Sequence, residues 1–195
     1  MPNKPDIAAL LGSRICHDLI SPIGAIGNGV ELLAMEPGGV RPEMALISES
    51  VANANARIRF FRICFGQAST DQRIARSEVA SILGDLTRGG RVGYGWTSPV
   101  ELSRREVRLV FLLLQCLESA LPYGGQIIIS CDDGRWTLET REGEVRLDPT
   151  LLARLRAAAP LGALSASQVQ FALARAEIEA QGRRLDVRHD SHGLH

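Results

Sequence analysis

The chain has 195 residues, 45% hydrophobic and 23% charged, and its 22 Lys and Arg balance 22 Asp and Glu. These values are ordinary for a globular protein of one large or two small domains. Zero net charge provides no bulk field to attract nucleic acid or a membrane surface, and no apolar run reaches the roughly 18–20 residues that a bilayer requires. The first residues carry no signal-peptide pattern, so we expect a cytoplasmic protein that binds neither nucleic acid nor membrane.

The spacing of cysteine and histidine argues against a metal site. The cysteines are scattered without a C-x-x-C pair, which favours buried, reduced thiols over a zinc or disulfide framework; they are Cys16, Cys64, Cys116 and Cys131. Near the C-terminus, histidines recur every third residue, at positions 189, 192 and 195. A frayed tail is the expected state of such a segment, and no metal is predicted.

A long amphipathic segment predicts a first helix from Asp6, whose carboxylate caps it, to Met35, with 37-Pro-Gly-Gly-39 ending it. Its apolar face recurs at steps of three and four, through Ile15, Leu19, Pro22, Ile26, Gly29 and Leu33. His17 lies on the opposite side, which it shares with Ser13, Arg14, Ser21, Gly24 and Asn28. An exposed imidazole beside Asp18 on a rigid helix suits reversible proton or phosphoryl chemistry.

Glycines are unusual inside a helix because each costs about 1 kcal/mol relative to alanine. Gly24, Gly27 and Gly29 all lie within the predicted first helix. Two explanations stay open at this point: close approach of a partner helix, or a flexible point beside Pro22.

A second helix is predicted from Pro42, which suits a first helical turn. A heptad-like apolar seam follows, made of Met44, Ile47, Val51, Ala54, Ile58, Phe61 and Phe65. Two such helices form a hairpin that cannot bury both faces alone, so we expect a homodimer whose hairpins pair into a four-helix bundle. Arginines cluster around the end of this helix, at positions 57, 59, 62, 73 and 76. A solvated face is expected there, with contact to an acidic partner as the alternative.

Composition changes after residues 67–70, which predicts a division into domains 1–70 and 71–195. A capping box, Ser103 to Glu106, opens a helix to Leu121 that is apolar nearly all round and therefore central. Other predicted elements are helices 77–87, 149–159 and 165–182, the last capped by Ser165 and Gln168, and strands 91–97, 126–131, 135–141 and 184–188. The fold class is thus α+β: a helical hairpin, then a two-layer α/β sandwich with a mixed sheet.

The first helix resembles the phospho-acceptor box of dimeric sensor histidine kinases, H-[DE]-L-x-x-P followed by an aliphatic residue. His17, Asp18, Leu19, Pro22 and Ile23 all match. The second half is similar to the ATP-binding domain of these kinases in the order of its elements, and residues 179–187 look like the end of that domain.

The nucleotide-binding residues of that domain are missing. Ser119 stands where the family has its Mg²⁺-binding asparagine, Pro122 where a basic residue is expected, and 142-Glu-Gly-Glu-144 where D-x-G-x-G should hold adenine. Residues 164–167, Leu-Ser-Ala-Ser, replace the Gly-rich phosphate lid. Because phosphates need close backbone N–H groups and Mg²⁺ needs oxygen ligands, we expect a degenerate ATPase domain that binds neither ATP nor another cofactor.

A kinase-like chain that keeps the histidine but lacks the nucleotide site resembles the ChpT-type histidine phosphotransferases. Residues 16–26 and 28–33 are closely similar to that family's signature. The resemblance implies a homodimeric relay that carries phosphate from the receiver of a CckA-type hybrid kinase to response regulators of CtrA or CpdR type. Mg²⁺ would be supplied by the receiver.

The resemblance makes His17 the phospho-acceptor. Asp18 would orient or deprotonate the His17 ring; the alternative is that Asp18 is a plain solvated acid. Ser21 would contact the phosphoryl group; the alternative is that Ser21 is a plain surface serine. Arg14, which can balance the charge of the phosphoryl group, and Asn28 are expected to dock the receiver. Two rival functions remain: a non-catalytic adaptor that docks receivers, and an atypical ATP-dependent histidine kinase.

Overall fold

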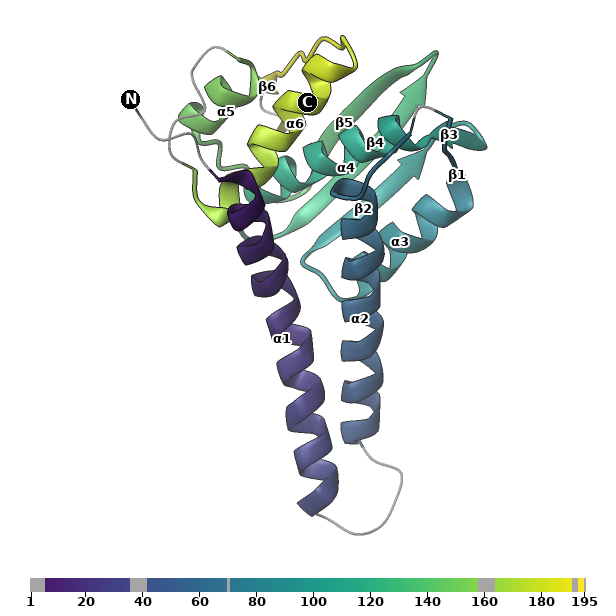
Figure 1. Ribbon diagram of the computed structural model, residues 1–195, viewed down its shortest axis with the longest axis vertical. Coiled ribbons are helices and arrows are strands. Elements are labelled where there is room, and N and C mark those ends of the chain that lie inside the picture. Colours follow the sequence, from purple (N-terminus) through teal and green to yellow (C-terminus); the bar gives the residue numbers. More distant parts are fainter. Residues whose placement is uncertain (1–5, 36–41, 70, 158–163, 191–192, 195) are drawn as a thin grey trace.

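A helical hairpin projects from an α/β sandwich in the computed structural model, which describes residues 6–35, 42–69, 71–157, 164–190 and 193–194 (Figure 1). The hairpin consists of α1 (Ile7–Met35) and α2 (Pro42–Cys64), which pack against each other. This arrangement confirms the α+β class and both long helices.

The predicted start and buried face of α1 are confirmed. The Asp6 carboxylate accepts a hydrogen bond from the Ala9 N–H at 3.1 Å, so it caps the helix. Pro22 lies within the helix and is buried. The remaining residues of the predicted apolar face are buried or half-buried: Ile15, Leu19, Ile26, Gly29 and Leu33. The expected helix stop at 37–39 lies outside the described residues.

Close packing accounts for one of the three glycines of α1. A Cβ atom on Gly29 would lie 2.5 Å from Cγ1 of Ile47 on α2, so a larger residue would require the Ile47 side chain or the helices to shift. Gly24 and Gly27 have no such neighbour within 4 Å among the described residues of this chain.

One part of the apolar seam of α2 lies in the core, and another part lies at the surface. Phe61 is buried and Phe65 packs against the core, where the base of the hairpin enters the sandwich. Phe60, next to the seam, stacks on Phe111 with ring centroids 4.5 Å apart. Met44, Val51 and Ile58, seven residues apart, remain 53%, 41% and 44% exposed. The described residues of this chain leave this second part of the seam largely uncovered.

The sheet of the sandwich is mixed, as predicted, but it has three of the four predicted strands, because residues 184–188 form no strand. Its order is β2 (Val92–Thr97), β4 (Gly125–Asp132), β5 (Arg135–Arg141), with β4 parallel to β2 and antiparallel to β5. The helices are α3 (Arg76–Arg88), α4 (Arg104–Ser119), α5 (Pro149–Leu155) and α6 (Val169–Ala180), the last preceded by the 3-10 turn η1 (Ala166–Gln168).

α4 is the central helix, as its apolar sequence predicts. It packs against α2, α6 and the sheet, and Phe111, Leu112 and Leu114 are fully buried. The aromatic rings of Trp96 and Trp136 join this core from β2 and β5, with centroids 5.2 Å apart. The predicted cap of Ser165 and Gln168 is confirmed at the η1 turn that precedes α6, where Gln168 accepts from Ser165 N at 3.3 Å. Asp148 caps α5 by accepting from Thr150 N at 2.8 Å.

The predicted capping box at Ser103 is wrong. The Ser103 side chain makes no capping hydrogen bond, and Glu106 forms an ion pair with Arg183. Ser103 belongs instead to the short strand β3 (Glu101–Ser103), which pairs with β1 (Arg73–Ala75), a ladder that the sequence analysis did not anticipate. α4 therefore begins at Arg104 and ends at Ser119, before the predicted end.

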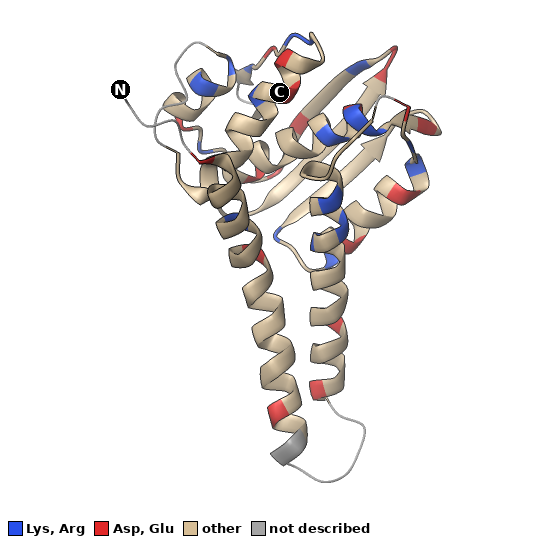
Figure 2. Ribbon diagram, viewed as in Figure 1, with Lys and Arg blue, Asp and Glu red and all other residues tan. Residues whose placement is uncertain are grey.

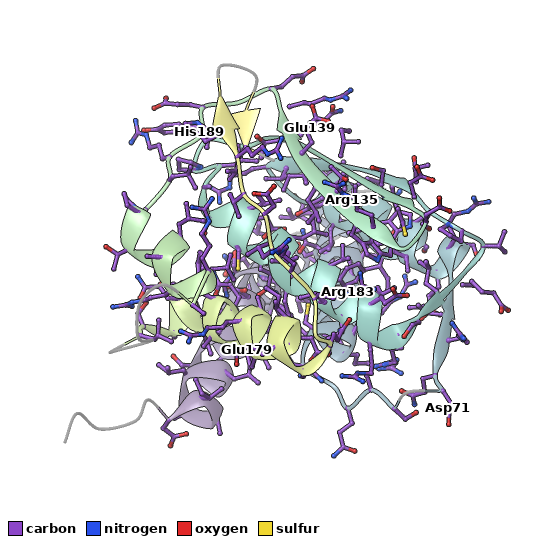
Figure 3. All side chains as sticks on the ribbon, turned by 90° about the horizontal axis from the view of Figure 1, so that it is seen from above. Asp71, Arg135, Glu139, Glu179, Arg183 and His189 are labelled. Carbon is purple, nitrogen blue, oxygen red and sulfur yellow. The ribbon has the colours of Figure 1, made fainter. Side chains whose placement is uncertain are left out.

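Two predictions near the C-terminal end of the chain also need correction. α5 ends at Leu155 because Arg156 already has non-helical backbone. The predicted strand 184–188 is not a strand; a small hairpin of β6 (His189–Asp190) and β7 (Gly193–Leu194) follows it. Thr140 of β5 accepts from Leu194 N at 2.8 Å, so this hairpin occupies the space beside β5 (Figure 3, at His189 and Glu139).

The cysteine prediction is correct for Cys64 and Cys116, which are buried, but wrong for Cys16, which is exposed, and for Cys131, which is partly exposed. His189 lies in β6, and His192 and His195 lie outside the described residues. In the described part of the chain, no helix combines the length and apolarity needed to cross a bilayer.

Candidate functional site

His17 lies on the solvent side of α1, as the helical periodicity predicts. Its side chain is 85% exposed, and its Nδ1 atom lies 3.2 Å from Oδ1 of Asp18. Because a carboxylate only accepts hydrogen bonds, this contact favours the tautomer with the proton on Nδ1. The lone pair of Nε2 is then available for reaction on the exposed side of the ring.

Asp18 is held from the other side by Arg14. Arg14 Nε donates to Asp18 Oδ2 at 2.7 Å, one helical turn away, and the Asp18 side chain is only 12% exposed. Arg14 Nη1 also donates to the backbone carbonyl of Ser167 in η1, at 3.3 Å. These contacts connect the exposed imidazole to the sandwich through two side chains.

The remaining predicted site residues lie along the same helix. Ser21 and Asn28 are exposed, one and three turns after His17 on its side of α1. Arg14 differs from them, since its side chain is 18% exposed and its guanidinium is bonded to Asp18 and Ser167. Contact of Arg14 and Asn28 with a receiver stays a prediction.

Sequence reasoning missed a polar cavity of about 270 Å³ between the base of the hairpin and the sandwich. Arg14 and Asp18 line it together with Arg57, Tyr94 and Glu118. Tyr94 donates a hydrogen bond from its hydroxyl to the Glu118 carboxylate. The signal for Glu118 was available, because an acid in a helix that is apolar nearly all round needs a polar neighbour.

Burial changes the acid–base properties of this pair. Burial raises the pKa of the Glu118 carboxyl above its ordinary value, and Asp18 adds to the rise, while the hydrogen bond from Tyr94 and the charges of Arg14 and Arg57 oppose it. Burial and the neighbouring Glu118 also raise the pKa of Tyr94. Both groups therefore favour their neutral forms more than exposed ones do.

Ser119 and Pro122, which stand where the resemblance predicts nucleotide-binding residues, lie in the sandwich. Ser119 donates from Oγ to the Cys116 carbonyl at 2.6 Å, and the Pro122 carbonyl accepts from Arg91 at 2.6 Å. Ser119 lines a second cavity, of about 1070 Å³, between α4, β5, α5 and α6. Leucines make up much of its wall: Leu109, Leu113, Leu117, Leu138, Leu147, Leu151, Leu152, Leu155, Leu185 and Leu194.

Comparison with known proteins defines the class first. A protein-family model described as the histidine phosphotransferase C-terminal domain matches residues 76–193. A solved structure described as a bacterial phosphotransferase has a TM-score of 0.81 and 31% identity, covering 100% of this chain and 97% of that one. The chain therefore has the fold of a phosphotransferase.

The family follows from a curated relative. The protein phosphotransferase ChpT of Brucella abortus (strain 2308) is 34% identical over 188 residues, covering 93% of this chain and 90% of that protein. Together with the family match, this similarity shows that the chain belongs to the family of ChpT-type histidine phosphotransferases.

Proposed function

We propose that the chain is the histidine phosphotransferase of a multistep phosphorelay and that His17 carries the phosphoryl group. The observation that carries the proposal is the geometry of His17: an 85% exposed ring whose Nδ1 is bonded to Asp18, on a helix whose other face is buried. The solvent-facing Nε2 lone pair can approach an aspartyl phosphate on a docked receiver, because the helix presents it without obstruction.

The proposed reaction is an in-line displacement. The Nε2 lone pair attacks the phosphorus atom of the donor's aspartyl phosphate, the N–P bond forms, and the P–O bond to the aspartate breaks with the electron pair leaving on its carboxylate. The resulting ring is cationic and keeps its Nδ1 proton, so the Asp18 carboxylate stabilises it. Transfer to the second receiver is the same reaction in reverse, and Mg²⁺ is expected on the receiver.

The resemblance to the ChpT family supports a proposal for the phosphoryl donor and acceptors. We propose the receiver of a CckA-type hybrid kinase as donor and CtrA- or CpdR-type response regulators as acceptors. Ser21 and Asn28 are exposed on the same side of α1 as His17. In the proposed role Ser21 contacts the transferred group and Asn28 contacts the receiver. In this role the protein is cytoplasmic and needs no nucleic acid or membrane.

We propose that two copies pair through their hairpins. Apolar residues remain exposed on both helices: Ile20, Ile23, Val30 and Leu32 on α1, and Met44, Leu46, Val51 and Ile58 on α2. Figure 2 shows that charged residues are sparse along the part of the hairpin that projects beyond the sandwich. An exposed apolar surface of this kind fits a four-helix bundle formed with a second copy.

We propose that residues 71–195 form a degenerate ATPase-like domain without nucleotide. Support comes from Ser119, whose hydroxyl is engaged by the Cys116 carbonyl where the resemblance places a Mg²⁺ ligand. Calorimetry with Mg-ATP is expected to give no saturable heat at millimolar nucleotide. A micromolar dissociation constant would favour the kinase alternative.

Transfer from a receiver tests the proposed function. A hybrid-kinase receiver carrying ³²P-phosphate is mixed with the protein, and label is expected on the protein and then on a response regulator. His17→Ala and His17→Asn are expected to accept none while still binding the receiver, since an exposed residue contributes little to stability. Binding without label on the unmodified protein would indicate the adaptor alternative instead.

A further inference from the structure

We propose that Arg14 is a positioning residue for phosphoryl transfer: it fixes Asp18 against His17 and links that pair to the η1 turn of the sandwich. The inference rests on the proposed transfer through His17. Arg14 bonds Asp18 through Nε at 2.7 Å and the Ser167 carbonyl through Nη1 at 3.3 Å. These two partners are separated by about three quarters of the sequence, so one guanidinium joins the first helix to the last part of the sandwich.

The imidazole is far more exposed than the two side chains that hold it. The His17 side chain is 85% exposed, that of Asp18 12% and that of Arg14 18%. Removing one partner of a covered ion pair leaves an uncompensated charge on the other. Asp18 can therefore hold the imidazole only while Arg14 holds Asp18.

Among the described residues, two other arginines line the cavity beside Arg14, and both are bonded elsewhere. Arg91 donates from Nη1 to the Pro122 carbonyl at 2.6 Å. Arg57 lines the same cavity, but its Nε is bonded to Asn53 at 2.9 Å. Glu118 also faces the cavity, and its carboxylate accepts a hydrogen bond from Tyr94. Arg14 lowers the pKa of Glu118, whereas Asp18 raises it. The charge of Arg14 thus balances two acids, one beside the exposed histidine and one inside the molecule.

The hydrogen bond from Arg14 to the Ser167 carbonyl links the position of the Asp18–His17 pair to the η1 turn of the sandwich. The Ser167 carbonyl also accepts from Gln170 Nε2 at 2.9 Å, so the carbonyl is oriented within its own turn. Residues 164–167 replace the phosphate lid of the kinase-like domain, and here this segment contacts the phospho-acceptor helix. A planar guanidinium can serve two acceptors in fixed directions, which a lysine ammonium cannot do equally well.

The tautomer of His17 provides a direct readout. Free imidazole favours the proton on Nε2, whereas the bond to Asp18 favours Nδ1 and leaves Nε2 as the nucleophile. ¹⁵N NMR of the imidazole distinguishes the two forms. In Arg14→Gln we expect the population to move toward Nε2–H, and in Arg14→Lys to move less, because the lysine keeps the charge.

Transfer kinetics provide the second readout. Arg14→Gln is expected to lower the maximal rate of phosphoryl acceptance by about ten- to a hundredfold with little change in the half-saturating receiver concentration. Arg14→Gln combined with Asp18→Asn should be little slower than either single variant, because both break the same chain of contacts. Amide hydrogen exchange in residues 166–169 is expected to accelerate in both Arg14 variants.

Arg59→Gln is the matched control, since Arg59 also forms an ion pair, with Asp85 at 3.0 Å, but contacts neither His17 nor Asp18. An unchanged tautomer in both folded Arg14 variants would overturn the proposal, as would an equal loss of rate in Arg59→Gln. A raised half-saturating concentration with an unchanged maximal rate would make Arg14 a docking residue instead. Because the NMR measurement needs no transfer, it tests this chain of contacts even if His17 proves not to be phosphorylated.

Discussion

The hairpin and the sandwich differ in how they treat apolar residues. In the sandwich, large side chains such as Phe111, Leu114 and Ile127 are fully buried, whereas Ile20 and Ile23 on the hairpin are 70% and 58% exposed. One part of the chain has a complete core and the other displays an apolar surface. The comparison indicates that the sandwich and the base of α2 are stable through the core that they share, while the projecting part of the hairpin has surface to share with another molecule.

The largest expected effect is on the hairpin surface. Val51→Glu is expected to convert the proposed dimer to monomers or insoluble protein, because a charge would be placed in an apolar interface. Sedimentation velocity measures the change. Ala80→Glu, which places the same charge on an exposed position of α3 in the sandwich, should remain dimeric. A folded monomer of the unmodified chain would contradict the account of the hairpin.

The next effect concerns the core of the sandwich. Leu114 is fully buried, so Leu114→Ala should lower the free energy of unfolding by about 2–5 kcal/mol. Val100 belongs to the same part of the chain but is 67% exposed, and Val100→Ala should change this free energy by less than about 0.5 kcal/mol. Urea unfolding measures both, and similar values for the two variants would refute the contrast.

A smaller effect is expected at the junction of the two regions. Since burial raises the pKa of Glu118 in the folded protein, the folded state binds its proton more tightly than the unfolded chain. This contribution to stability is full at low pH and falls as pH rises above the unfolded value of about 4.3. Glu118→Gln removes the titration and still leaves an acceptor for Tyr94.

Relative to the unmodified protein, Glu118→Gln should therefore gain stability as pH increases from 4 to 7. Thermal unfolding across this range provides the measurement, with Glu179→Gln, an exposed acid on α6, as control. A difference that stays constant with pH would show that Glu118 titrates as an ordinary surface acid.

The smallest effect concerns the thiols. Cys16 on the hairpin is exposed, whereas Cys64 and Cys116 are buried and burial raises their pKa values. An aromatic disulfide reagent should modify Cys16 in the native protein and reach the two buried thiols only after unfolding. Mass spectrometry locates the modified residues, and early labelling of Cys64 would mean that the hairpin base opens readily.

Much of the fold could be predicted because it follows from local patterns. The three- and four-residue periodicity around His17 gave both the helix and the exposed side of the ring, and the cap at Asp6 followed from its type and position. The strands 92–97, 125–132 and 135–141 were predicted within a few residues because their apolar runs are bounded by turn residues.

The features that were missed depend on contacts between distant residues. Glu106 pairs with Arg183 instead of closing a capping box, and the last strands form at 189–190 and 193–194, where Leu194 bonds Thr140 of β5, not at 184–188. The bond from Arg14 to Ser167 and the pair of Tyr94 with Glu118 likewise join separate elements. No local pattern specifies which of several arginines meets which acceptor, so these contacts needed the structure.

The most direct test of the central claim is to locate the phosphoryl group itself. After incubation with a phosphorylated receiver, the protein is expected to carry phosphate that is labile in acid and stable in base, on the peptide containing His17. ³¹P NMR should identify the Nε2 isomer, because Asp18 occupies Nδ1. Phosphate on another residue, or none on a protein that binds the receiver, would contradict the account.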